Sequence, residues 1–366
     1  MNYRLSTIYP RKSHAADVTE IIEINVADPI SAFIIEMSVG NTASAAPTAH
    51  ALECLTNISL VDGSDVLFSL SGKQADALDW YCNGLQRSNW NPYLNGMDTQ
   101  RFIGINFGRH LWDGQLAFDP KKFRNPQLKF SIDLDAGGCA PDEVVIEIWA
   151  CVFDQKEVTP IGFLMAKEIK DYLLAASAHE YSDMPTDHMY RKMLIRCQRA
   201  GTEPNQILDN IKLSEDQDKR VVFDHGTEDI FRSIAIRTPK YHEEIIGHVG
   251  TTQTYGYCTP TSRVNGICQR WAETVGAGEI AFYDGDGGRF KVISATIASN
   301  MQVTLAGWLP HGVWEIPFGD QNDMADWYDV TKIGSLRADI LTGSGALTTD
   351  SVQLFLQQLR KYAGGA

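Results

Sequence analysis

The residues in this sequence best suited to chemistry are its acidic side chains. Two carboxyl groups that flank a glycosidic bond can hydrolyse it, one as acid and the other as base or nucleophile. The chain offers such groups in two places, Glu143, Glu147 and Asp154 in the first half and Asp323 and Asp326 in the second. Glu147 lies in the middle of an expected strand, opposite an apolar face. We therefore expect it to point toward solvent or a neighbouring subunit.

Metal-binding patterns are weak. His242 and His248 flank EEIIG, and His242 with the next two glutamates could supply ligands. The spacing does not match an H-E-x-x-H helix, so a surface loop is the favoured interpretation. DGDGG (284–288) resembles the start of a calcium loop, but no acidic residue stands where the closing glutamate belongs. A hairpin turn is the better interpretation there.

Other catalytic signatures do not add up to an active site. The sequence contains no G-x-S-x-G, P-loop or G-x-G-x-x-G motif. The seven cysteines form no C-x-x-C pair, which favours buried thiols in a reducing compartment over a zinc site or a disulfide framework. We predict that the chain is not an enzyme and has no catalytic, cofactor-binding or metal-binding residues.

Four of the eight tryptophans gather around two similar segments: Trp112, Trp308, Trp314 and Trp327. They could line a glycan groove, anchor loops against a β-sandwich or fill a subunit interface, where tryptophan is enriched. Packing or an interface is the favoured interpretation.

The two segments are the first sign of an internal repeat. INFGRHLWDGQLAFD (105–119) and IPFGDQNDMADWYD (316–329) share Phe-Gly, a tryptophan-containing polar loop and an aromatic-Asp pair. LTNISL (55–60) matches LDNIKL (208–213) at an offset of 153, and each precedes an expected short helix. LKFSIDLDAGG (128–138) matches LRADILTGSGA at an offset of 208, which continues without a gap to place Ile146 opposite Leu354. Repeated blocks in the same order predict a duplicated fold.

The elements that carry these blocks are mostly strands. Residues 128–134 alternate apolar and polar side chains, as a half-buried strand does. The Asp62-Gly63 turn predicts a hairpin, and EIAFYD and RFKVIS predict another across DGDGG. The β-branched and aromatic match to EVVIEIWACVFD favours a strand for the C-terminal SVQLFLQQLRKY. One helix is expected between the halves at 163–181, where FLMAKEIKDYLLAASAHEY has no Gly or Pro.

The predicted fold class is all-β, with two tandem eight-stranded jelly rolls, a linking helix, and short helices after the early strands. We expect an N-terminal arm at 1–17, a first roll at 18–160, a linker helix region at 161–188, and a second roll at 189–366. The offsets differ by 208 − 153 = 55 residues. We expect this extra length as a surface-loop insertion around 238–300.

Composition fits a soluble protein made in the cytosol. The 366 residues suffice for two domains, and no apolar stretch reaches the ~18 residues of a membrane span. No signal-peptide pattern is visible at the N-terminus. The net charge of −14 argues against a protein whose main task is binding nucleic acid. Arg4, Arg11 and Lys12 form a local basic stretch that could touch a phosphate-rich surface, although a frayed, solvated terminus is favoured.

LTNISLVDGSDVLFSLSGKQADALDWY (55–81) and INFGRHLWDGQLAFDPKKFRNPQLKFSID (105–133) carry a family resemblance. With the echo IPFG…YDVTKIGSLRADI, they resemble the double jelly-roll major capsid proteins of the adenovirus-like lineage, in the short form of tailless icosahedral bacteriophages. The resemblance spans nearly the whole chain in architecture and is specific in about two short blocks.

The resemblance implies a structural virion protein, made in the host cytoplasm, with no cofactor and no sequence-specific nucleic acid. It implies a homotrimer that forms a pseudo-hexagonal capsomer and tiles an icosahedral shell. The partners would be neighbouring capsomers and vertex (penton) and minor capsid proteins. The insertion would form an outer tower. The N-terminal arm, with Arg4, Arg11 and Lys12, would lie on the inner side, commonly facing an internal lipid membrane.

Two other functions are compatible with tandem jelly rolls. One is a glycan-binding or carbohydrate-active protein, and the other is a secreted adhesin or fibre domain. The missing acid pair in matched loops counts against hydrolysis, and the missing signal peptide counts against export. The duplication itself predicts one strand order in both halves, with 105–119 and 316–329 at equivalent positions.

Overall fold

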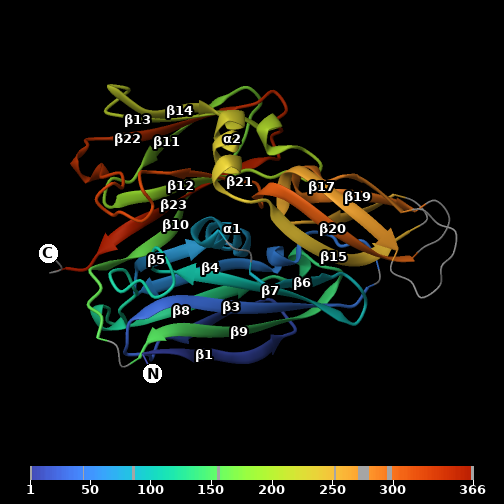
Figure 1. Cartoon of the computed structure of the whole chain (residues 1–366), viewed down its shortest axis with the longest axis horizontal. Helices are drawn as coiled ribbons and strands as arrows, with labels where there is room; N and C mark the ends of the chain where they lie inside the picture. Colours follow the sequence, from blue (N-terminus) through green and yellow to red (C-terminus); the bar gives the residue numbers. More distant parts are fainter. Residues whose placement is uncertain are drawn as a thin grey trace.

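A computed structural model of the chain describes residues 2–43, 45–84, 87–154, 157–250, 253–270, 280–294 and 299–363. Strands dominate these ranges, and two jelly rolls lie one above the other in Figure 1. Among the described residues, no helix is long and apolar enough to cross a membrane.

The first roll consists of two facing four-stranded sheets. One has the order β1 (Tyr3–His14), β9 (Pro141–Phe153), β3 (Ile30–Asn41), β7 (Met97–Asn106). The other has the order β2 (Val18–Glu23), β8 (Pro126–Ile132), β4 (Leu55–Asp62), β5 (Asp65–Leu70). Their inner faces carry alternating buried apolar residues, as in β8.

The second roll repeats this arrangement. One sheet has the order β10 (Gly162–Leu173), β23 (Ser351–Lys361), β12 (Met189–Arg196), β21 (Val313–Pro317). The other has the order β11 (His179–Met184), β22 (Leu336–Thr342), β13 (Leu208–Glu215), β14 (Arg220–Gly226). The strand orders are the same in both rolls, so the predicted duplication is confirmed.

β-bulges that occur in both rolls show which residue of the first roll corresponds to which residue of the second. β4 and β13 carry bulges at matching positions against both neighbours, at the predicted offset of 153. The pairing of β8 with β4 and of β22 with β13 makes Phe130 equivalent to Ile340, an offset of 210. β9 pairs with β3, and β23 pairs with the equivalent strand β12. These two pairings make Ile148, and not Ile146, equivalent to Leu354. The predicted gapless 208 is therefore wrong by two residues in each strand, a slip that keeps the same face.

The two Phe-Gly segments occupy equivalent positions. Phe118 exchanges backbone hydrogen bonds with Ile30, and Tyr328 exchanges them with Tyr190. The aspartates that follow, Asp119 and Asp329, each cap a short 3₁₀-helix by accepting from the backbone N–H two residues on. The repeated motif is therefore the approach to strands β8 and β22.

The predicted linking helix at 163–181 is wrong. This segment forms β10, β11 and the turn between them. β10 pairs with β23 along its whole length and is equivalent to β1, so the second roll begins at Gly162. Leu, Ala, Lys and Glu favour helix only weakly, and the sheet neighbours on both sides override that preference.

The N-terminal segment is likewise neither an arm nor frayed. Tyr3–His14 forms β1, which is hydrogen-bonded to β9 at the edge of the first sheet. Its charged residues are typical of an edge strand that avoids uncontrolled pairing.

The two predicted short helices are present, α1 (Gly72–Asn83) after β5 and α2 (Thr227–Arg237) after β14. Ser71 and Gln74 form a capping box at the start of α1, whereas Gly226 begins α2 without a side-chain cap. Short 3₁₀-helices complete the described elements: η1 (Ala51–Cys54), η2 (Pro120–Lys122), η3 (Leu134–Ala136), η4 (Pro204–Gln206), η5 (Asp286–Gly288) and η6 (Val330–Lys332).

The insertion lies between α2 and β21, as predicted, and projects to the right in Figure 1. Its strands are β15 (Tyr241–Val249), β16 (Thr254–Tyr257), β17 (Pro260–Arg270), β18 (Ile280–Asp284), β19 (Arg289–Ser294) and β20 (Ser299–Pro310). β18 and β19 are antiparallel across DGDGG, which confirms that hairpin. Parts of the predicted 238–300 insertion, at 251–252, 271–279 and 295–298, lie outside the described residues.

The two rolls share sheets. β5 pairs in parallel with β10, and β6 (Asn89–Pro92) pairs in parallel with β15. One continuous apolar core extends through both rolls. The seven cysteines are free thiols, and burial raises the pKa of Cys54 and Cys197 to about 12. The prediction of buried thiols is confirmed for five of them, while Cys82 and Cys268 are half-buried.

Candidate functional site

The carboxylates considered for glycoside hydrolysis do not form an acid pair. Asp154 binds Arg4 and Glu143 binds Ser13, while Asp323 and Asp326 accept backbone hydrogen bonds within their own loop. Glu147 is half-buried on the outer face of the first sheet, in agreement with the prediction that it points outward. These groups stabilise strands and turns.

The segment around His242 is strand β15 and not the expected surface loop. Strand alternation turns His242 and Glu244 outward and Glu243 inward. Among the described residues, no group of three or more His, Cys, Asp or Glu side chains is arranged to hold a metal ion.

The four tryptophans pack against protein. Trp314 is fully buried in the second roll, and Trp327 is buried with its indole N–H donating to the Asp320 carbonyl. Trp112 contacts the Tyr3 ring, and Trp308 contacts the Phe231 ring. These contacts agree with the interpretation of packing over a ligand groove.

The main polar site of the molecule is a buried cluster between the first roll and the insertion. Its centre is Arg101 on β7, which donates to Glu243 on β15 at 2.7 Å and to Asp76 on α1 at 3.2 Å. Asp76 also bonds to His311 at 2.9 Å. Glu243 accepts from the Thr259 backbone N–H at 2.7 Å. The cluster is completed by His50, Asn91 and Tyr241.

The pKa values in this cluster follow from burial and from its fixed charges. Burial works against ionisation of Glu243, but His50 and Arg101 outweigh it and lower its pKa to about 2. Burial lowers the pKa of His50 and lowers that of His311 well below its usual value. Burial also raises the pKa of Asp76. The ion pair of Arg101 with Glu243 is therefore maintained, with neutral imidazoles beside it.

This cluster is a joint and not a catalytic centre. Arg101 and Glu243 are each almost fully buried, so no substrate reaches them. The bonds connect α1 and β7 of the first roll with β15 and the β20–β21 turn of the second half. A satisfied buried network of this kind fixes one relative arrangement of the parts it joins.

Sequence reasoning missed the cluster, although one signal was present. In β15, Tyr241, Glu243, Ile245 and Val249 fall on one alternating face, and all are buried. A glutamate on an otherwise apolar strand face predicts a buried partner.

A second buried ion group lies where α1 packs on the second roll. Lys192 binds Glu315 and also donates to the Tyr81 backbone carbonyl on α1 at 2.7 Å. Tyr81 donates to the Val313 carbonyl at 2.7 Å. Arg237 on α2 binds the other oxygen of Glu315 at 3.0 Å. The junction is therefore held by hydrogen bonds at two separate places.

The two repeated loops also meet each other. Arg109 donates to the Asn322 carbonyl at 2.7 Å. Leu116 and Trp327 share a small apolar cluster with Leu164 and Leu359. The duplicated segments thus connect the two rolls.

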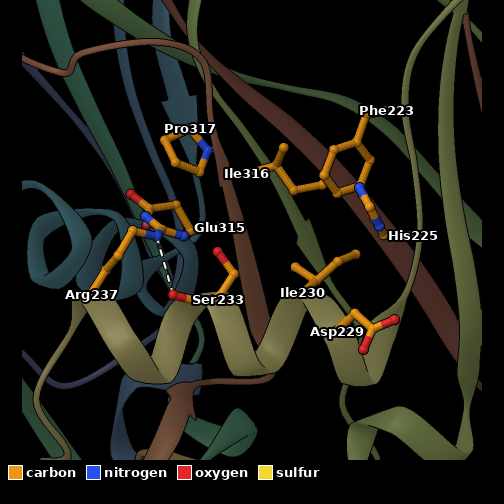
Figure 2. A pocket seen from close by; sticks show the side chains of 9 residues that line it. All are labelled: Phe223, His225, Asp229, Ile230, Ser233, Arg237, Glu315, Ile316 and Pro317. Carbon is orange, nitrogen blue, oxygen red and sulfur yellow. Dashed lines mark hydrogen bonds and ion pairs between the residues drawn. The ribbon is translucent and has the colours of Figure 1, made fainter.

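One pocket, of about 280 Å³, lies between α2, β14 and β21 (Figure 2). Its lining residues are Phe223, His225, Asp229, Ile230, Ser233, Arg237, Glu315, Ile316 and Pro317. Arg237 is held by Glu315 and the Ser233 carbonyl, and Asp229 by Arg232. These charged groups bind one another, so the pocket does not gather polar groups around a substrate.

The basic residues of the N-terminus are engaged within the chain. Arg4 binds Asp28 and Asp154, Arg11 binds Glu36, and Lys12 binds Glu20. They lie along β1.

A larger basic group lies near the C-terminus, on the left in Figure 1, around a hollow of about 750 Å³. We call it the basal surface. Its cations are Lys121, Lys122, Lys167, Arg360 and Lys361, and its acids are Asp65 and Asp187.

Solved structures with the same fold cover the whole chain. The STIV MCP (from Sulfolobus Turreted Icosahedral Virus) is 12% identical, with a TM-score of 0.62 over 99% of this chain and 97% of that chain. PBCV-1 VP54 is 10% identical, with a TM-score of 0.60 over 98% and 94%. The major capsid protein P2 from bacteriophage PM2 is 10% identical, with a TM-score of 0.53 over 99% and 99%. No protein-family profile and no curated protein sequence matches the chain. The likeness shows that the chain has the double jelly-roll fold.

Proposed function

We propose that this protein is a viral major capsid protein that forms the shell of an icosahedral virion. The observation that carries the proposal is the match over nearly the whole chain, across both rolls, to structures named as capsid proteins. A structural role also fits the buried polar joint, because a shell unit needs two rolls held in one arrangement. The protein acts without a cofactor and without catalysis. A glycan-binding function gains no support from the tryptophans, which are used in packing.

The assembled unit in this proposal is a homotrimer. Three chains contribute six similar rolls, which make a pseudo-hexagonal block that can tile a surface with its neighbours. The insertion forms a tower on the outer side. Vertex and minor capsid proteins are the further partners, and they bind at the edges of this lattice.

Assembly tests the proposal directly. We expect the purified chain to have a native mass of three times 40.7 kDa by light scattering, and to appear as hexagonal particles in electron micrographs. A chain that stays monomeric at high concentration, or that hydrolyses or binds a glycan as a monomer, would contradict the proposal.

In virions with an internal membrane, we propose that the basal surface faces it. This replaces the expected contact through Arg4, Arg11 and Lys12, because intramolecular ion pairs engage those cations. The basal surface has five cations, one of which (Arg360) is paired with Asp65, against two acids, and it lies at the end away from the insertion. Cations close to an anionic membrane each contribute about 1 kcal/mol to binding.

A vesicle experiment measures this contact. Reversing Lys121 and Lys122 to glutamate is expected to weaken binding to phosphatidylserine vesicles by at least about 30-fold, since two attractive contacts of about 1 kcal/mol are lost. The matched control changes Arg11 and Lys12 to glutamate and should bind the vesicles like the wild type. Binding of both variants is measured by vesicle flotation. If the control loses binding and the basal variant keeps it, the N-terminal strand is the membrane contact.

A further inference from the structure

The chain contains one completed junction between rolls. The outer edge of β5 in the first roll pairs in parallel with β10 of the second, through Phe68 with Ala166 and Ser69 with Lys167. Above this pairing, α1 packs on the outer face of the second roll, where the Tyr81 hydroxyl bonds to Val313. The junction therefore has two parts, an edge-to-edge strand pairing and a helix seated on a sheet face.

Each part has an equivalent on an opposite side of the molecule, where the matching edge or face is left open. β14 is the second roll's equivalent of β5, and β1 is the first roll's equivalent of β10. In the described part of the chain, each is the last strand of its sheet. Figure 1 shows β14 at the top and β1 at the bottom of the molecule.

The shared bulges define which residues correspond on the strands. β10 and β1 have the same bulge, between Glu168 and Lys170 in one and between Thr7 and Tyr9 in the other. Ala166 is therefore equivalent to Leu5, and Lys167 to Ser6. The pairing of β4 with β5 and of β13 with β14 makes Phe68 equivalent to Phe223, and Ser69 to Asp224.

Burial differs between the completed and the open positions. Ala166 is 2% exposed, whereas its equivalent Leu5 is 59% exposed. Tyr81 is the tenth residue after the Ser71 N-cap of α1, and Ile236 is the tenth after the Gly226 N-cap of α2. Tyr81 is 6% exposed and Ile236 is 86% exposed, the largest value among the exposed apolar side chains described.

The sheet faces show the same difference. Beneath α1, the outer face of the second roll presents three fully buried side chains: Leu194, Val313 and Phe355. Their equivalents on the first roll are Ile34, Phe102 and Trp149, by the matching ladders of β3, β7 and β9. These three are only half-buried, and they form an apolar surface on the outside of a sheet.

We infer that a second copy of this chain completes the open junction, with β14 and α2 of one copy docking on β1 and the outer sheet face of the next. Leu5 of one copy pairs beside Phe223 of its neighbour, and Ile236 inserts against Ile34, Phe102 and Trp149. The inference rests on the proposed function for its closed ring of three chains, but the docking surfaces follow from the internal repeat alone.

The contact is head to tail, because each copy offers two different surfaces. Such contacts close into a ring when a whole number of rotations from one copy to the next makes 360°. A ring of three chains would contain six junctions, three within chains and three between them, all built from equivalent strands.

The test introduces a charge at the docking helix. Ile236→Asp is expected to convert the trimer to a monomer with an unchanged circular dichroism spectrum, because Ile236 is exposed in the single chain. The matched control is Ile21→Asp on β2, which is 55% exposed. Its equivalent, Tyr181, stays 59% exposed beside the completed junction, so the control should remain trimeric.

A second experiment detects the contact positively. Leu5→Cys combined with Phe223→Cys should give disulfide-linked dimers and trimers on oxidation, because these residues meet only between copies. Each single variant should give no linked species at the same protein concentration. Linked species in the double variant alone support the inferred register.

The outcomes separate the inference from the proposed function. A wild-type trimer that survives Ile236→Asp and forms no Leu5–Phe223 link overturns the docking surfaces and leaves the capsid function standing. A wild-type chain that is monomeric at all concentrations contradicts both. Loss of the trimer in the Ile21→Asp control as well would show that the contact does not use the equivalent surfaces.

Discussion

Replacing Arg101 with alanine is expected to lower the free energy of unfolding by about 3–5 kcal/mol, because it leaves a buried charge without its partner. Arg101 is 1% exposed, and its two acidic partners, Glu243 and Asp76, are almost entirely buried. Without the guanidinium, Glu243 must keep its charge in the protein interior or take up a proton. Urea denaturation followed by fluorescence measures the loss.

The control for this prediction is an exposed ion pair of similar composition. Arg232 binds Asp229 at 2.9 Å on the surface of α2, with both side chains more than 60% exposed. Arg232→Ala should change the free energy of unfolding by less than about 1 kcal/mol. Equal losses in the two variants would show that the buried cluster does not hold the rolls together. The double change of Arg101 and Glu243 to methionine should recover part of the loss, since no charge is then stranded.

Most of the fold was predicted from repeated sequence blocks and from the alternation of apolar and polar side chains along strands. Matching the Phe-Gly segments and the LTNISL and LDNIKL strands predicted two similar rolls, and both strands kept their offset of 153 in the structure. Alternating side chains were enough to predict β8, and its repeat β22 shows the same alternation of burial, because each of these strands has one face toward a core.

The segment 163–181 shows where sequence reasoning fails. Phe163 to Ala166 are all buried, because β10 lies between β23 and β5 and is covered on both faces. A strand buried on both faces loses its alternation and reads like a helix. Its role is set by pairings with strands that are remote in the sequence, β5 before it and β23 after it.

The candidate site was harder to predict than the fold. The joint around Arg101 draws on α1, β6, β7, β15 and three connecting segments, and no short motif joins them. The docking surfaces are harder still, since Ile236 and Leu5 look like ordinary surface residues. Their part in docking is inferred by comparing the exposure of each with that of its equivalent in the other roll. That comparison requires the positions of the β-bulges to be known.

Acidification is expected to weaken the joint, beginning well above the range where ordinary carboxylates titrate. Burial lowers the pKa of His50 and His311 below the ordinary 6.5, so the folded state excludes protons that the unfolded state binds. Stability from a depressed pKa is complete above the unfolded value and is lost as the pH falls below it. Between pH 7.5 and 5.5, the proton excluded by His311 costs about 1.4 kcal/mol, and the lowered pKa of His50 adds to that loss.

The acidic partners act at lower pH and with opposite signs. Glu243, with a pKa of about 2, adds a further loss as the pH falls below its ordinary 4.5, whereas the raised pKa of Asp76 offsets part of it. The histidine step is isolated by His50→Asn, which keeps a side chain able to cap η1 but cannot titrate. Its loss of stability between pH 7.5 and 5.5 should be smaller than that of the wild type in urea titrations. An unchanged slope in His50→Asn would show that protons reach the joint without opening it.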